Sequence, residues 1–169
     1  MGLRNVLVEG VSGTGKTAVC HELRRRGHHA INGDRELAYQ GDPETGEARD
    51  DVTGLAVHDH HLWRADEVRA MALDHSHPVT FFCGGSRNVA AFADVFDAIV
   101  VLTVDAATLA RRLDERPADE WGGHGRTRER ELIERLHRTQ EDVPATGVRI
   151  DAGAPLAVVV DEILRVTLG

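Results

Sequence analysis

The chain of 169 residues has very little lysine, cysteine and aromatic side chain. Lys16 is the only lysine among 20 basic residues, so arginine carries nearly all of the positive charge. The two cysteines, Cys20 and Cys83, cannot build a disulfide framework and favour a reducing, cytoplasmic location. No apolar run approaches the length of a membrane span, and the first residues lead directly into a predicted strand. We therefore expect neither a membrane segment nor a signal peptide.

Acidic residues outnumber basic ones, and the net charge is −8 at pH 7. This surplus of negative charge argues against nucleic acid as the main partner. The length suits one compact domain with a sizeable hydrophobic core. Nothing in the composition indicates an oligomeric state.

The lone lysine lies in a glycine-rich octapeptide, GVSGTGKT, which fits the P-loop pattern G-x-x-x-x-G-K-[ST]. Glycine backbone and the start of a following helix can offer N–H groups to an anion. Lys16 would place a compact ammonium near the β- and γ-phosphates, where a guanidinium fits poorly, and Thr17 would offer its hydroxyl to Mg²⁺. We therefore expect ATP and Mg²⁺ as cofactors, with nucleotide contacts from Gly10, Ser12, Gly13, Thr14, Gly15, Lys16, Thr17 and Ala18.

Strand and helix patterns alternate along the chain. Strands are predicted at residues 5–8, 30–31, 79–83, 98–104 and 148–150, and helices at 17–26, 61–74, 88–96, 106–115, 127–140 and 155–166. This order predicts an α/β fold with helices on both faces of a parallel sheet and a ligand site at the carboxyl ends of its strands. Two turn-rich segments, 40–53 and 116–128, are expected to leave the sheet as mobile loops.

With these features, the chain resembles the small P-loop kinases of the adenylate kinase and shikimate kinase superfamily. The resemblance implies a P-loop NTPase fold, a three-layer αβα sandwich with a five-stranded parallel sheet, in a single domain over residues 1–169. It also implies an acceptor-binding excursion at about residues 35–77 and a short lid at about residues 116–128. Only the P-loop is a specific motif by itself.

The segment NGDREL at residues 32–37 resembles a shikimate kinase segment in which two acids lie two residues apart. Asp34 matches the acid that contacts the substrate hydroxyl, which implies a role as the catalytic base. Asn32 replaces the acid that is associated with Mg²⁺. Asp34 could therefore serve instead, together with Thr17, as a metal ligand, and the two roles are alternatives.

Further positions resemble substrate-binding elements of the two kinase families. Arg64 matches the arginine that holds the anionic group of the substrate in shikimate kinases, and Arg138 matches a second substrate arginine. Gly84 and Gly85 match shikimate kinase glycines. Arg87 falls on the arginine of the adenylate kinase Asp-Gly-Phe-Pro-Arg motif, whose acid is absent here.

Arg112 and Arg116 resemble the Arg-x-x-x-Arg at the base of the kinase lid, and their spacing places them on one helix face. In the family the first arginine lies against adenine and the second reaches phosphate, so Arg116 is also expected to be catalytic. Ala154 and Pro155 match the adenine-side loop. Eight arginines share residues 111–138 with seven acids, so solvated ion pairs are the simpler interpretation of most of the others.

Ten histidines include a cluster at residues 58–61, but its spacing fits no standard zinc pattern. A polar surface is the simpler interpretation, and the alternative is that Asp59 or His60 lines an acceptor pocket.

Together these features predict an ATP-dependent phosphotransferase that moves the γ-phosphoryl group to the hydroxyl of a small acceptor. Asp34 indicates that the acceptor has a hydroxyl group. Arg64 indicates that an acceptor with an anionic group is one of the alternatives. The alternatives are a nucleoside monophosphate kinase, favoured by Arg87, and a regulatory module that binds nucleotide without turnover. A GTPase switch is disfavoured because its Asn-Lys-x-Asp motif needs a second lysine.

Overall fold

The computed structural model describes residues 4–121 and 126–169. Its central sheet has five parallel strands in the order β2-β5-β1-β6-β7. The strands are β1 (Arg4–Gly10), β2 (His29–Asn32), β5 (Val79–Cys83), β6 (Ala98–Thr103) and β7 (Val148–Asp151). The longer helices are α1 (Lys16–Arg25), α4 (Ala65–Leu73), α5 (Ala106–Asp114), α6 (Arg126–Thr139) and α7 (Leu156–Leu168).

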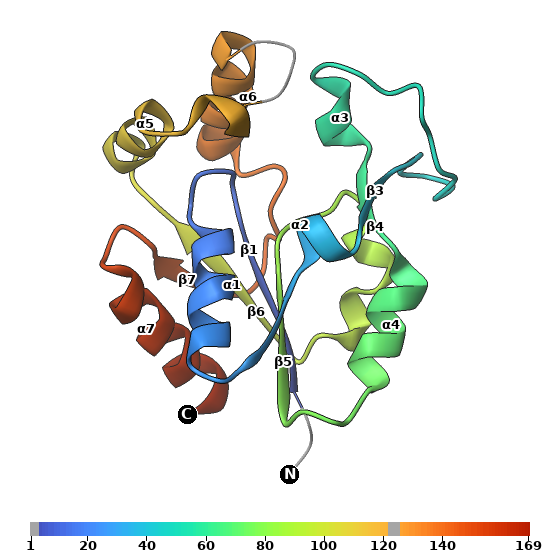
Figure 1. Ribbon diagram of the computed structural model, residues 1–169, viewed down its shortest axis with the longest axis vertical. Helices are drawn as coiled ribbons and strands as arrows, with labels where there is room; N and C mark the ends of the chain where they lie inside the picture. Colours follow the sequence, from blue (N-terminus) through green and yellow to red (C-terminus); the bar gives the residue numbers. More distant parts are fainter. Residues whose placement is uncertain (1–3, 122–125) are drawn as a thin grey trace.

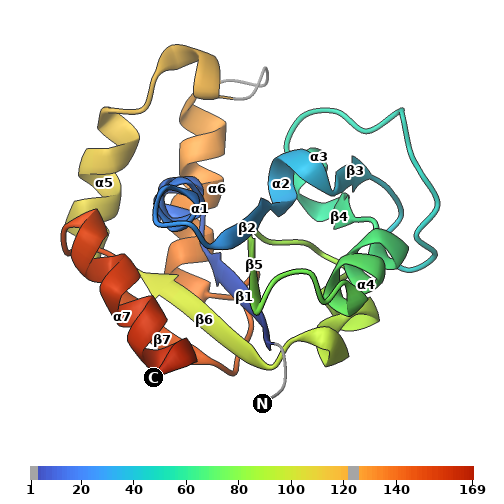
Figure 2. The same cartoon turned by 60° about the horizontal axis from the view of Figure 1, so that its bottom comes forward.

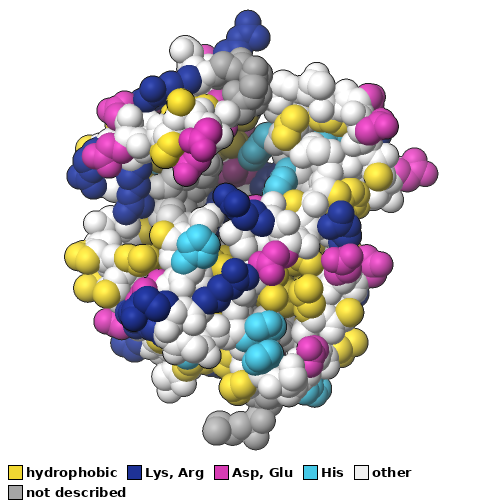
Figure 3. Space-filling model, in the orientation of Figure 1, with side chains coloured by type: hydrophobic (Ala, Val, Ile, Leu, Met, Phe, Trp, Pro, Cys, Tyr) yellow, Lys and Arg dark blue, Asp and Glu magenta, His cyan; other side chains and the backbone are white. Residues whose placement is uncertain are grey.

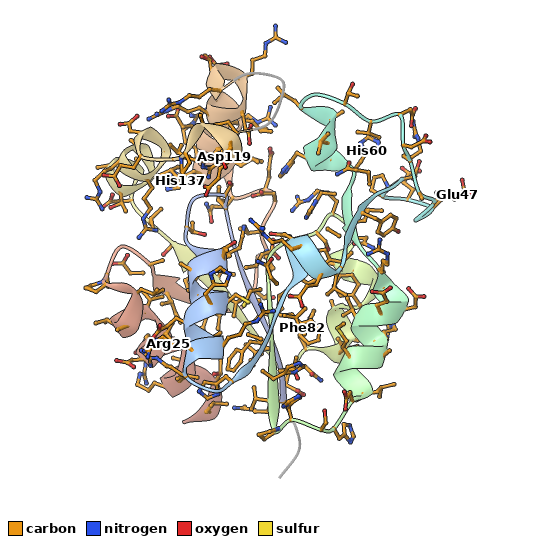
Figure 4. The ribbon with its side chains drawn as sticks, viewed as in Figure 1. Arg25, Glu47, His60, Phe82, Asp119 and His137 are labelled. Atoms are coloured by element: carbon orange, nitrogen blue, oxygen red, sulfur yellow. The ribbon has the colours of Figure 1, made fainter. Side chains whose placement is uncertain are left out.

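The predicted α/β fold with a five-stranded parallel sheet is confirmed, and helices cover both faces of the sheet (Figures 1 and 2). One buried cluster packs α1, α5, α6 and α7 against β1, β5 and β6, and a second cluster packs α4 against the other face. Phe82 of β5 lies near the centre of the molecule (Figure 4) and belongs to the second cluster. Both cysteines are buried free thiols.

The excursion after β2 contains a second sheet that the sequence did not predict. Two short antiparallel strands, β3 (Ala38–Gln40) and β4 (His61–Trp63), pair in it, and two short helices, α2 (Gly33–Glu36) and α3 (Ala56–Asp59), flank it. The helix expected at 61–74 is therefore wrong at its start and begins only at Ala65. The cause is that β4 is held extended by β3 and by the Asn88 amide, which bonds both the N–H and the C=O of Trp63.

The helix expected at 88–96 is also wrong, because this segment forms two 3₁₀ turns, η1 (Val89–Ala91) and η2 (Ala93–Val95). Phe92 separates them with a φ of −144°, outside the helical range. Its ring lies 5.9 Å from Trp63 and 6.1 Å from Phe96 between ring centres. The segment thus makes the i to i−3 hydrogen bonds of 3₁₀ turns, such as Phe92 N–H to the Val89 carbonyl at 3.0 Å, while the Phe92 ring is buried.

Two lobes rise beyond the carboxyl end of β1 (Figure 1). One carries α5, the 3₁₀ turn η3 (Ala118–Glu120) and α6, and the other carries α3, β3 and β4. Residues 122–125 of the expected lid lie outside the described part of the chain. No helix in the described ranges is both long and apolar enough to cross a bilayer.

Packing of Trp63 on Gly33 generates a test of this arrangement. A Cβ added at Gly33 would lie 2.1 Å from Cζ2 of Trp63, so the indole must move. We expect Gly33→Ala to lower the free energy of unfolding by about 1–3 kcal/mol, measured by urea denaturation. The same substitution in a Trp63→Phe background should cost less, because phenylalanine lacks the atoms that clash. An equal cost in both backgrounds would contradict the packing described here.

Candidate functional site

A cavity of about 660 Å³ lies between the two lobes, above the carboxyl end of β1. The space-filling view shows a hollow there with histidine side chains at its edge (Figure 3). Its floor is the glycine-rich loop, one wall comes from α5, η3 and α6, and the opposite wall comes from α3 and β4. The predicted site residues that line it are Gly10, Ser12, Gly13, Gly15, Lys16, Thr17, Ala18, Asp34, Gly85, Arg87, Arg112 and Arg116.

The loop between β1 and α1 has the geometry expected of an anion cradle. Gly15 caps α1 in the left-handed conformation, with φ 103°, which glycine adopts without strain. Lys16 is the first residue of α1, and its ammonium donates to the carbonyl of Gly10. Thr14 is buried beneath the loop and donates its hydroxyl to the carbonyl of Val11 at 2.7 Å. The main-chain N–H groups at the start of α1 thus lie open to the cavity.

The two lid arginines occupy different positions. Arg112 donates to the carbonyls of Gly13 and Thr14 at 3.3 and 3.1 Å and to the carbonyl of Ala152 at 2.6 Å, so it joins the phosphate loop to the loop after β7. Arg116 donates to the Ser12 hydroxyl at 3.1 Å, and its guanidinium lies 4.8 Å from the Trp121 ring centre. Within the described residues, Arg116 makes one hydrogen bond and one cation–π contact, and it lines the cavity, so its guanidinium can reach a phosphate group there.

Asp34, in α2, is oriented by three hydrogen bonds to one of its two carboxylate oxygens. Oδ1 accepts from His61 Nε2 at 2.9 Å, from the Gly85 main-chain N–H at 3.2 Å and from the Trp63 indole at 3.3 Å. Among the described residues, no hydrogen bond is made to Oδ2. Burial raises the pKa of Asp34. The hydrogen bond from His61 and the charge of Lys16 lower it by more than burial raises it, so the pKa of Asp34 lies below its ordinary value. The carboxylate is therefore ionised at neutral pH.

Two glycines lie next to the two carboxylates in the floor of the site. A Cβ at Gly84 would lie 2.7 Å from Oδ1 of Asp34, and one at Gly85 would lie 2.7 Å from Oε1 of Glu9. The two glycines thus let the loop after β5 approach these acids closely. Gly84 contacts Asp34 and Trp63 but does not line the cavity.

Glu9 is a cavity residue that the sequence analysis missed. It is the penultimate residue of β1, it is 2% exposed, and burial raises its pKa to about 8 despite the charges of Lys16 and Arg87. It is therefore protonated at neutral pH and can donate a hydrogen bond. A single acid inside the apolar run VLVEG was the sequence signal that could have identified it.

Four more polar residues line the cavity, Arg87, His61, His58 and Asp142, and the sequence did not indicate the last two as site residues. Arg87 Nη2 donates to the main-chain carbonyl of Asp142 at 2.6 Å, and the Arg87 N–H donates to the carbonyl of His61 at 2.9 Å. His58 and His61 line the cavity, whereas Asp59 and His60 do not. His60 instead bonds the carbonyl of Ala56 (labelled in Figure 4).

Several predicted site residues lie outside the cavity. Arg64 is 5.7 Å from the Tyr39 ring centre and 4.0 Å from Glu67, on the outer side of the excursion. Arg138 is exposed near the end of α6, and Ala154 and Pro155 lie between β7 and α7. The structure thus separates the two arginines expected to hold an anionic substrate group from the cavity.

The oxygen ligands beside the glycine-rich loop fit an Mg²⁺ ion that would bind together with the nucleotide phosphates. Thr17 and Asp34 both line the cavity, and Asp34 Oδ2 is open. Asn32 is 5% exposed and does not line the cavity. Mg²⁺ in such sites takes one or two protein oxygens together with phosphate and water. Within residues 4–121 and 126–169, no group of three or more His, Cys, Asp or Glu side chains could hold a metal ion by itself.

Residues 6–143 match the AAA domain family, and the chain belongs to that family. Its fold is that of the small P-loop kinases. A shikimate kinase from Bacteroides thetaiotaomicron superposes with a TM-score of 0.63 at 16% identity, over 98% of this chain and 99% of that one. A gluconokinase from Sinorhizobium meliloti 1021 has a TM-score of 0.51 at 22% identity, over 96% and 90%.

A sugar kinase from Janibacter sp. HTCC2649 is similar in fold as well, with a TM-score of 0.55 at 16% identity, over 96% of this chain and 93% of that one. No curated protein matches the sequence significantly.

The buried acid of β1 makes stability depend on pH in a defined direction. The pKa of Glu9 rises from 4.5 to about 8 on folding, so between these values the unfolded chain releases a proton that the folded protein keeps. This group therefore lowers the free energy of unfolding as pH rises through that window, by at most about 1.4 kcal/mol per pH unit. Below pH 4.5 both states are protonated, and the penalty is absent.

Urea denaturation of the wild type and of Glu9→Gln across this pH window checks the effect. The variant should gain stability relative to the wild type as pH rises. A difference that stays constant with pH would mean that Glu9 ionises as easily in the folded protein as in the unfolded chain.

Proposed function

We propose that the protein is an ATP-dependent kinase that transfers the γ-phosphoryl group of ATP, in the presence of Mg²⁺, to the hydroxyl of a small molecule. The observation that supports this most strongly is the position of Asp34. It lines the same cavity as Lys16, and its Oδ2 has no donor among the described residues. An ionised carboxylate with one fixed oxygen and one open oxygen is suited to orient a hydroxyl group.

The other residues of the cavity supply what phosphoryl transfer requires, which is charge neutralisation and alignment. Lys16 and the N-terminus of α1 would hold the β- and γ-phosphates, and Arg116 would approach the transferring group from the lid. Bound Mg²⁺ would neutralise further phosphate charge beside Thr17. The low pKa of Asp34 suits orientation of the acceptor more than full proton abstraction, because a loose transition state needs little help from a base.

The similar folds of a shikimate kinase, a gluconokinase and a sugar kinase support a small-molecule acceptor. Arg87, the residue that favoured a nucleoside monophosphate kinase, donates to the carbonyl of Asp142 and so is partly used within the protein. This contact supports the small hydroxylated acceptor over a nucleoside monophosphate.

Lys16→Ala should abolish ATP consumption with any acceptor, lowering kcat by about 10²-fold or more, because no other lysine can neutralise the transferring phosphate. Steady-state kinetics and circular dichroism measure the loss and verify the fold. The matched control is His21→Ala, an exposed position on the same helix, which should retain activity. A normal kcat for Lys16→Ala would show that the glycine-rich loop does not take part in catalysis.

Asp34→Asn distinguishes acceptor orientation from metal binding. If Asp34 orients the hydroxyl, the variant should bind ATP and Mg²⁺ normally but phosphorylate the acceptor roughly 10²–10⁴-fold more slowly at every Mg²⁺ concentration. Rates across a Mg²⁺ series, beside isothermal titration with nucleotide, measure both properties. Asp66→Asn, an exposed carboxylate on α4, is the control. Recovery of the rate at high Mg²⁺ would assign Asp34 to the metal instead.

A further inference from the structure

The acceptor end of the cavity contains a buried carboxylate without a hydrogen-bond partner. The side chain of Asp142 is 8% exposed and lines the cavity, and its Oδ1 has no hydrogen-bond donor among the described residues. Its Oδ2 is 3.7 Å from His58 Nε2, which is too far for a hydrogen bond. A buried carboxylate is costly unless a donor or a positive charge meets it.

Among the described residues, the neighbouring side chains make no hydrogen bond to this carboxylate. Arg87 bonds the main-chain carbonyl of Asp142, and no ion pair forms between the two side chains within the described residues. Burial, together with the charge of Arg87, lowers the pKa of His58, so its imidazole is uncharged at neutral pH. The carboxyl group of Asp142 therefore lies at the wall of the cavity with Oδ1 unbonded and with no ion pair to Arg87 among the described residues.

The rest of the acceptor end offers no excess of positive charge for an anionic ligand. Lys16, Arg112 and Arg116 belong to the phosphate side of the cavity, and Arg64 lies outside it. Arg87 is the one arginine that lines the acceptor end within the described residues.

A chain of contacts connects the carboxylate of Asp34, through its bonded oxygen Oδ1, with Asp142. Asp34 bonds the side chain of His61, the main chain of His61 bonds Arg87, and Arg87 bonds the main chain of Asp142. The two carboxylates thus line the same cavity and are joined by three successive hydrogen bonds.

We infer that the acceptor is a small hydroxylated amine, an amino alcohol or amino sugar, whose ammonium binds Asp142 while its hydroxyl lies at Asp34 Oδ2. This inference rests on the proposed kinase function. The acceptor oxygen forms a bond to the γ-phosphorus as the bond from that phosphorus to the β-phosphate oxygen breaks, so ADP leaves. Asp34 Oδ2 accepts the hydrogen bond of the hydroxyl, whose proton is released to solvent once the bond to phosphorus has formed. The protonated nitrogen has no lone pair and is not phosphorylated.

The test compares three small sets of compounds that differ in charge: the amines ethanolamine and glucosamine, the neutral ethylene glycol and glucose, and the anions glycolate and gluconate. Binding to the protein with a non-hydrolysable ATP analogue and Mg²⁺ is measured by titration calorimetry, and phosphorylation is measured as ADP release with ATP. We expect an amine to bind at least about 10-fold more tightly than its neutral counterpart and to be phosphorylated.

The variant Asp142→Asn should lose this preference, with amine affinity reduced about 10-fold or more and nucleotide affinity unchanged. Asp142→Glu, which keeps the charge, should retain part of it. Asp119→Asn, an exposed carboxylate on η3 outside the cavity, should behave as the wild type.

Each outcome decides between the two proposals. Phosphorylation confined to neutral or anionic compounds would overturn the amine inference and leave the kinase function standing. Amine binding that depends on Asp142 without any phosphorylation would overturn the kinase function instead. Amine binding that is absent, or unchanged in Asp142→Asn, would overturn the inference.

Discussion

The hydrogen bonds to Asp34 Oδ1 connect three segments that are distant in sequence. His61 and Trp63 come from the end of the excursion, Gly85 comes from the loop after β5, and Asp34 itself follows β2. Because all three donors meet one oxygen, the excursion is fixed against the sheet, and the second oxygen is left open to the cavity. These three hydrogen bonds orient the acid, and together with the Asn88–Trp63 bonds they hold the excursion against the sheet.

Charge is distributed unevenly around this centre. The glycine-rich loop and the segment after α5 present Lys16 and Arg116, whereas another part of the lining presents the Asp142 carboxyl group, whose Oδ1 has no hydrogen bond among the described residues. Glu9 lies buried in the floor with its proton retained, so it adds no negative charge beside the phosphates at neutral pH. Such fixed charges and dipoles stabilise a reacting phosphoryl group without reorganisation during the reaction. The fold thus brings Lys16, Arg116 and the Asp142 carboxyl group to one cavity, and this is the arrangement on which the proposed acceptor rests.

The sequence predicted the parts of the molecule that depend on local pattern. The phosphate loop and the five strands follow from glycine spacing and apolar runs, and the structure has them. The antiparallel pair of β3 and β4 could not be predicted from the sequence. Each strand is only three residues long and is held extended by tertiary contacts, such as that of Asn88 with Trp63.

The acceptor wall was equally hidden, because His58 and Asp142 meet only in the tertiary structure. The family resemblance implied that Arg64 binds the substrate. In the structure Arg64 lies against the Tyr39 ring and does not line the cavity.

A crystal structure with a non-hydrolysable ATP analogue and Mg²⁺ tests the central claim most directly. The account predicts that the β- and γ-phosphates lie on the N–H groups at the start of α1, against Lys16, with the γ-phosphate facing Asp34 Oδ2 across the cavity. Asp34 Oδ1 should keep its bonds to His61, Trp63 and Gly85. A nucleotide bound elsewhere, or an Asp34 side chain that turns away from the γ-phosphate, would contradict the account.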